Sequence, residues 1–142
     1  MANVVTTNYF REQVAGQNVS LSADAFAVAL MNIHVQSASE STLKQVQTWS
    51  EVSAYEVSAA GYSAEPLSAD TLSANTNNVV YWDGNNITWS SVTISPYGYT
   101  IYRISDGLVV GFVEFTTAPQ TTVNGDLTIQ WNANGIMNII SP

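Results

Sequence analysis

The chain has 142 residues, of which 46% are hydrophobic and 10% are charged, with a net charge of −8 and no cysteine. This length and apolar content suffice for one domain with its own core, and the missing thiols exclude disulfides and thiol chemistry. Because Arg11, Lys44 and Arg103 are the only basic residues, the acidic balance argues against binding to nucleic acids or anionic membranes.

The first residues carry no basic segment followed by an apolar one, so we expect no signal peptide. No apolar run approaches the roughly 20 residues of a membrane helix. Residues 8–16, NYFREQVAG, predict a two-turn helix that ends at Gly16. Asp24–Val35 is apolar enough for a strand or a buried helix, and its β-branched ending favours the strand.

The next part of the chain is more polar. Ser39–Val52 has apolar residues at helical spacing and predicts a short helix. Residues 53–78 are rich in Ser and Ala without a strong period, and they predict a long excursion with one short strand near Leu67–Leu72. No linker divides the chain, so we expect a single domain over residues 1–142.

The second half is dense in β-branched and aromatic residues with frequent turn signals, which is typical of an all-β region. Val79–Trp82 and Ile87–Ile94 predict two strands around an Asp-Gly-Asn-Asn turn at 83–86. The alternation within Ile87–Ile94 is imperfect, so either face could be half-buried. Pro96 and Gly98 then predict a break in the sheet.

A hairpin follows, with strands at 99–104 and 108–115 joined by a Ser-Asp-Gly turn at 105–107. The second strand, LVVGFVEF, is apolar on both faces, so it lies either at the centre of the fold or with one face in a subunit interface. Glu114 interrupts this apolar strand, and we expect it to pair with Arg103 or to lie on an exposed face, rather than to act as a perturbed acid.

The last segments predict a pair of strands, Leu127–Trp131 and Ile136–Ile140, joined by residues 132–135. Thr121–Asp126 contains an Asn-Gly dipeptide and predicts the turn before them. The fold class is therefore mainly β, an antiparallel β-sandwich of jelly-roll or immunoglobulin-like type, with one or two short helices in the N-terminal half.

Catalytic patterns are weak. His34 is the single histidine, it lies in an apolar run, and no nucleophile elbow accompanies it. The carboxylate pairs Glu51–Glu56 and Glu65–Asp70 fall in polar loops, where they are usually solvated. Residues 83–86 and 124–126 lack the ligand pattern of a calcium loop, and zinc and nucleotide motifs are missing. We therefore expect no enzyme, metal or cofactor.

Aromatic residues cluster in the sequence and allow two interpretations. They could form a platform on which sugar rings stack, or they could belong to the core or to a subunit contact, which we favour. The residues concerned are Trp82, Trp89, Tyr97, Tyr99 and Tyr102.

The order of the segments resembles a family of small virion structural proteins of tailed bacteriophages. The similarity is carried by four segments, "NNITWSSVTI", "YGYTIYR", "LVVGFVEF" and "VNGDLTIQWNANGIMNI". They correspond to a first strand at Ile87–Val92, an aromatic strand at Tyr99–Tyr102, an apolar strand at Leu108–Phe115 that follows a short turn, and a closing hairpin at Gly125–Ile139. It is strongest from residue 79 onward. The chain departs from the pattern in its few charges and in its long Ser/Ala-rich segment at 53–78.

This resemblance implies a capsid decoration or cement protein that is made in the host cytoplasm and lies on the phage head. Its expected partners are the major capsid protein and copies of itself, as a homo-oligomer, and a glycan-binding tail module is the alternative. A capsid-bound protein needs apolar surfaces for its neighbours and no reactive groups. The expected interface residues are Leu108, Val110, Phe112, Glu114, Arg103, Tyr97 and Tyr99.

Overall fold

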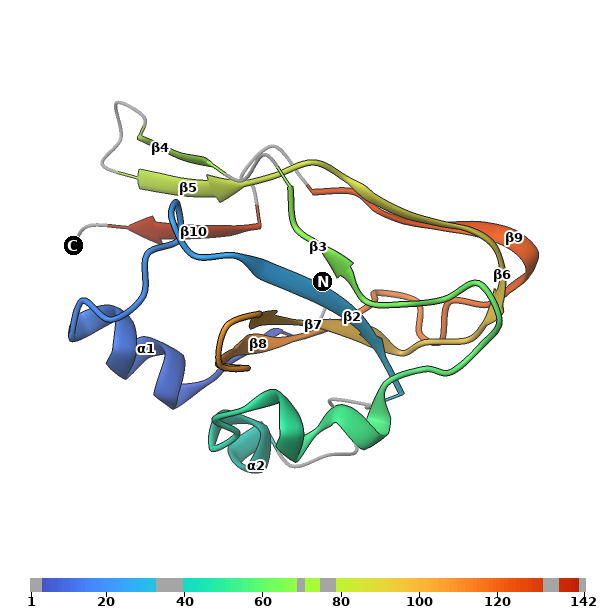
Figure 1. The fold of residues 1–142 in the computed structure, drawn as a ribbon, viewed down its shortest axis with the longest axis horizontal. Helices are drawn as coiled ribbons and strands as arrows, with labels where there is room; N and C mark the ends of the chain where they lie inside the picture. Colours follow the sequence, from blue (N-terminus) through green and yellow to red (C-terminus); the bar gives the residue numbers. More distant parts are fainter. Residues whose placement is uncertain (1–3, 33–39, 69–70, 75–78, 132–135, 141–142) are drawn as a thin grey trace.

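The structure is a computed structural model that describes residues 4–32, 40–68, 71–74, 79–131 and 136–140. It is mainly β, with antiparallel sheets and a few short helices in the N-terminal half, which confirms the expected fold class. A five-stranded sheet lies in the middle (Figure 1). A second layer of strands and the helix at Asn8–Ala15 pack on one of its faces, and the short helix at Glu40–Lys44 with the segment after it packs on the other. No helix in the described ranges is long and apolar enough to cross a membrane.

The five-stranded sheet has the order β1-β8-β7-β2-β3, and every neighbouring pair is antiparallel. The β7–β8 hairpin is the one expected from the sequence, and it turns at Ser105–Gly107. The strands are β1 (Val4–Thr6), β2 (Phe26–Met31), β3 (Glu65–Pro66), β7 (Gly98–Arg103) and β8 (Val109–Glu114).

Strand β2 lies inside this sheet, and all six of its side chains are buried. Phe26, Val28 and Leu30 face the main core, whereas Ala29 and Met31 face a second, smaller core. A strand covered on both faces has no polar side, which explains its continuous apolar sequence.

The second layer is one long bent ribbon. Strand β5 (Val79–Asp83) pairs with β10 (Met137–Ile140), and after the bend β6 (Ile87–Ile94) pairs with β9 (Thr122–Ile129). Strand β4 (Thr71–Ala74) extends the β5 end. At the bend, the indole N–H of Trp131 donates to the carbonyl oxygen of Asn85 at 2.9 Å.

The expected pairing of the last two strands, β9 and β10, is therefore wrong, and the two strands around residues 83–86, β5 and β6, do not pair with each other either. Strand β5 is instead followed by β6 in the next sheet, and β9 is followed by β10. The β5–β6 and β9–β10 stretches of the chain therefore run beside each other in opposite directions (Figure 1). Residues 132–135, the expected connection, lie outside the described part of the chain.

The Asn-Gly turn expected at Thr121–Asp126 is also wrong, because Thr122–Asp126 lie within β9. Asn124 (φ 48°) and Ser91 (φ 54°) have left-handed backbone conformations at opposing register shifts of the ribbon. The Asp126 carboxylate accepts the Ser91 amide at 3.0 Å. The register shift at Ser91 is a β-bulge, and it reverses the face toward which the following side chains of β6 point. Ile87, Trp89, Val92 and Ile94 are therefore all buried, which explains the imperfect alternation.

The expected helix near the N-terminus is confirmed as α1 (Asn8–Ala15). The Thr7 hydroxyl accepts the Phe10 amide at 3.2 Å and donates to the Val109 carbonyl oxygen at 2.6 Å, so it both caps the helix and attaches it to β8. Gly16 ends the helix, as the sequence indicates.

The expected helix over Ser39–Val52 is shorter in the structure, α2 (Glu40–Lys44), and is followed by two 3₁₀ turns at Trp49–Glu51 and Ser53–Tyr55. Between them the chain is extended, because the Val109 amide donates to Gln47 and the Trp49 amide donates to Gly107. Pairing with the start of β8 thus outweighs the helical spacing of the apolar residues.

The excursion after Val52 contains two short strands, β3 and β4, instead of one. Strand β3 precedes the position expected near Leu67–Leu72 and β4 overlaps its last two residues, and residues 69–70 lie outside the described ranges. The loop before β3 packs on the ribbon, since the Trp89 indole N–H donates to the Ser63 carbonyl oxygen at 2.7 Å.

Candidate functional site

Strand β8 and the residue directly before it, Leu108, account for four of the expected interface residues, and all four are buried within this chain. Leu108, Val110, Phe112 and Glu114 are between 1% and 5% exposed. The register shift near Ile101 also divides them, because Leu108 and Val110 face the main core and Phe112 faces the smaller one. The strand therefore takes the central position, and these side chains cannot reach a second subunit while the chain is folded.

Tyr97 and Tyr99 are half-buried. The Tyr99 ring lies 5.9 Å from that of Phe115 and 5.7 Å from that of Trp131, measured between centroids. Burial raises the pKa of Tyr99 to about 12. The backbone of Tyr97 connects the ends of β2 and β8. Its carbonyl oxygen accepts a hydrogen bond from the Phe115 amide, and its amide donates to the Met31 carbonyl oxygen. Both residues hold this end of the sheet together.

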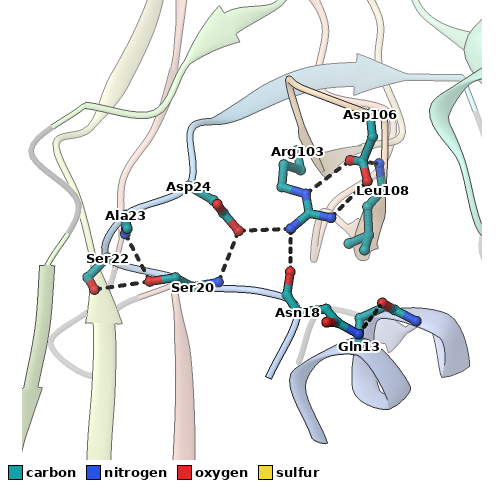
Figure 2. A network of polar contacts seen from close by, with 9 residues as sticks. All are labelled: Gln13, Asn18, Ser20, Ser22, Ala23, Asp24, Arg103, Asp106 and Leu108. Atoms are coloured by element: carbon teal, nitrogen blue, oxygen red, sulfur yellow. Dashed lines mark hydrogen bonds and ion pairs between the residues drawn. The ribbon is translucent and has the colours of Figure 1, made fainter. Parts of the chain in front are cut away.

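Arg103 lies at the centre of a polar network, shown in Figure 2. Its Nη1 donates to Asp24 at 2.9 Å and to the Asn18 carbonyl oxygen at 2.8 Å. Its Nε and Nη2 donate to the two carboxylate oxygens of Asp106 at 3.0 and 2.8 Å. The guanidinium thus joins the loop before β2 to the β7–β8 turn.

The two aspartates in turn hold backbone amides. Asp24 accepts the Ser20 amide at 2.9 Å, and Asp106 accepts the Leu108 amide at 3.1 Å (Figure 2). The Ser20 amide and the Arg103 side chain lower the pKa of Asp24, and Arg103 lowers that of Asp106. Each carboxylate has a fixed structural partner, so this cluster stabilises two loops.

The expected pair between Arg103 and Glu114 is wrong. Glu114 is opposite Gly98, at the far end of β7 from Arg103, and the guanidinium is bound to Asp24 and Asp106. The sequence suggested the pair because both residues lie in one hairpin. The strand register instead places Glu114 away from Arg103, and two aspartates lie closer to the guanidinium.

Two of the other candidate acids, Glu51 and Glu56, also hold structure. The Glu51 carboxylate accepts the Thr48 and Gln47 amides, which lowers its pKa. Glu56 accepts the Tyr62 hydroxyl at 2.8 Å. In the described ranges no three His, Asp or Glu side chains are grouped as metal ligands. His34 and Asp70 lie outside those ranges.

The aromatic residues do not form an exposed platform. Trp82 and Trp89 are 1% and 2% exposed and belong to the main core. The Tyr102 ring stacks on that of Trp49 at a centroid distance of 4.5 Å. The core interpretation of Trp82 and Trp89 is confirmed.

A shallow hollow of about 280 Å³ lies between the ends of the ribbon and the segment after Tyr55. Polar and apolar groups share its lining about equally, and no charged side chain contributes. Its lining residues include Asn32, Ser58, Thr93, Ser95 and Thr121. The hydroxyls of Ser95 and Thr121 are already bonded to each other at 3.0 Å. Such a lining has no nucleophile–base pair.

Sequence reasoning missed the surface of the β6–β9 ribbon. Its outward side chains, Thr88, Ser90, Thr93 and Thr128, are exposed and uncharged. The signal was present in the sequence, because Asp126 is the only charged side chain from Phe115 to Pro142. A scan against models of protein families, a search of curated proteins and a search of solved structures each found no match to this chain.

Proposed function

We propose that the chain is a non-enzymatic structural protein of a tailed-bacteriophage virion, binding the head surface as a decoration or cement protein. The resemblance of its strand and turn pattern to small phage virion proteins supports the virion role. Its partners are the major capsid protein and further copies of itself.

The observation that carries the proposal is the β6–β9 ribbon. One of its faces packs into the core, and the other presents hydroxyl side chains such as Thr88 and Thr128 with little charge. A surface of this kind suits contact with protein subunits, and it offers no reactive group. Because Leu108, Val110 and Phe112 are buried, the contact surface in this proposal is the ribbon and not β8.

The test uses capsids assembled from the major capsid protein encoded with this gene. Cosedimentation should show saturable binding at a copy number that matches the capsid symmetry, and the decorated shells should withstand higher temperature. Absence of binding to capsids would overturn the proposal. Binding to host-cell glycans in its place would favour a tail module.

A further inference from the structure

The outer side of strand β9 is an open sheet edge. On its inner side β9 pairs with β6, and within the described ranges no other strand pairs with it and no backbone hydrogen bond joins it to another element. The strand lies at the periphery of the molecule (Figure 1). Its outward side chains are exposed, and Val123 reaches 74%.

This edge carries few of the features that normally prevent strands of different molecules from pairing. Natural edges are protected by lysines, prolines, bulges or inward-pointing charges. Strand β9 contains no lysine, arginine or proline, and its single acid, Asp126, is bound to the Ser91 amide. The bulge at Asn124 interrupts the edge, but Leu127–Ile129 pair with consecutive residues of β6 and keep a regular backbone.

The charge distribution indicates which strand can pair there. Two molecules with a net charge of −8 repel each other. Strand β9 itself adds little to that repulsion, because Asp126 is the only charged side chain from Phe115 onward. A second copy also brings the same open edge, and two antiparallel copies of one edge match each other's donors and acceptors about a twofold axis.

We propose that the outer edge of β9 is the site at which a second copy of this chain adds by antiparallel strand pairing. The β6–β9 ribbons of the two molecules then form one four-stranded sheet. The inference rests on the edge itself and holds whether or not the protein belongs to a virion.

The size of the edge sets the strength of this contact. An eight-residue strand is roughly 26 Å long, and a strip about 10 Å wide buries far less than the roughly 800 Å² per partner of a stable interface. The dimer is therefore weak in dilute solution and forms at high local concentration. Salt strengthens it, because screening reduces the repulsion between the two acidic molecules.

The test is sedimentation velocity from micromolar to millimolar protein, at low and high salt. We expect reversible dimerisation that salt strengthens, and amide exchange at Leu127–Ile129 that slows as the dimer forms. Val123→Lys and Thr128→Lys should each raise the dissociation constant at least about tenfold, since the twofold axis introduces two like charges per substitution.

Val4→Lys is the matched control, because it makes the same change at a residue 62% exposed on β1, the edge of the other sheet. It should leave dimerisation unchanged. The proposal is overturned by a monomer at every concentration, by dimerisation insensitive to Val123→Lys, or by loss of the dimer in Val4→Lys alone. Circular dichroism verifies that each variant is folded, and the exchange measurement on the unaltered protein tests the edge without any substitution.

Discussion

The hydroxyl oxygen of Tyr62 accepts a hydrogen bond from the backbone amide of Leu30 at 2.9 Å and donates to the Glu56 carboxylate at 2.8 Å. Leu30 lies in β2, where Glu65–Pro66 and Glu56 pair with other positions on the same edge. The chain between Glu56 and Glu65 leaves the sheet, so no backbone carbonyl oxygen lies opposite the Leu30 amide, and the Tyr62 hydroxyl accepts its hydrogen bond instead. A buried amide is thus satisfied by a side chain from a distant loop.

Tyr62→Phe should destabilise the protein by about 1–3 kcal/mol, because it leaves the buried Leu30 amide without its acceptor. Urea unfolding measures the loss. Tyr55→Phe, at a tyrosine that is 54% exposed, should change the free energy of unfolding by less than about 0.5 kcal/mol. Equal effects of the two substitutions would contradict this role of the phenol.

Arg103→Lys should cost about 1–2 kcal/mol, since a lysine ammonium keeps the charge but cannot hold Asp24, Asp106 and the Asn18 carbonyl oxygen together. Arg11→Lys is the control, because Arg11 is exposed and bonds within α1 to Asn8. Thermal unfolding followed by circular dichroism compares the two. If Arg103→Lys leaves the free energy of unfolding unchanged, the planar, multidentate geometry of the guanidinium contributes nothing to stability.

The same network predicts a loss of stability in acid. The pKa values of Asp24 and Asp106 are lowered below their ordinary value of 3.8 in the folded protein. The unfolded state therefore binds protons first as pH falls, so this stabilisation is present above about pH 4 and disappears as pH drops through the folded pKa values.

Unfolding free energies measured from neutral pH to about pH 2 should fall less steeply for Asp24→Asn/Asp106→Asn than for the unaltered protein. Glu51, whose pKa is also lowered, contributes to the slope that remains. If the double variant and the unaltered protein show parallel curves, these aspartates are not the source of the acid sensitivity.

Gly98→Ala should prevent folding or cost more than about 3 kcal/mol, because a Cβ there would lie 1.9 Å from the Val113 carbonyl oxygen in the neighbouring strand. Gly125→Ala, where the nearest atoms lie at 3.8 Å, should cost less than about 1 kcal/mol. Denaturant titration of both variants checks the contrast. A well-folded Gly98→Ala protein would mean that β7 and β8 approach each other less closely than the structure indicates.

Much of the local structure follows from local chemistry. The helix at Asn8–Ala15, the apolar strand β2 and the β7–β8 hairpin were all predictable, because caps, periodicity and turn residues act over a few positions. The buried roles of Trp82 and Trp89 agree with the preference of large aromatic side chains for cores.

The candidate site was predictable only in part. Arg103 was singled out correctly as an ion-pair residue, but its partners Asp24 and Asp106 were not identified. Asp24 is 79 residues away in sequence, so no local pattern relates them. Leu108, Val110 and Phe112 alternate in the sequence as residues on one face of a regular strand do, and the bulge beside Gly111 places them on two faces.

Composition and periodicity were enough to specify an acidic, mainly β chain with few reactive groups and to locate many of its strands. They could not assign strand partners, because backbone hydrogen bonds are chemically alike between any two strands. The pairing of β9 with β6 and of β10 with β5 depends on which apolar faces meet around the core. The bulge at Ser91 and Asn124 depends on how closely the two strands fit together. Those are properties of the packed chain, and they determine which edge remains open at its surface.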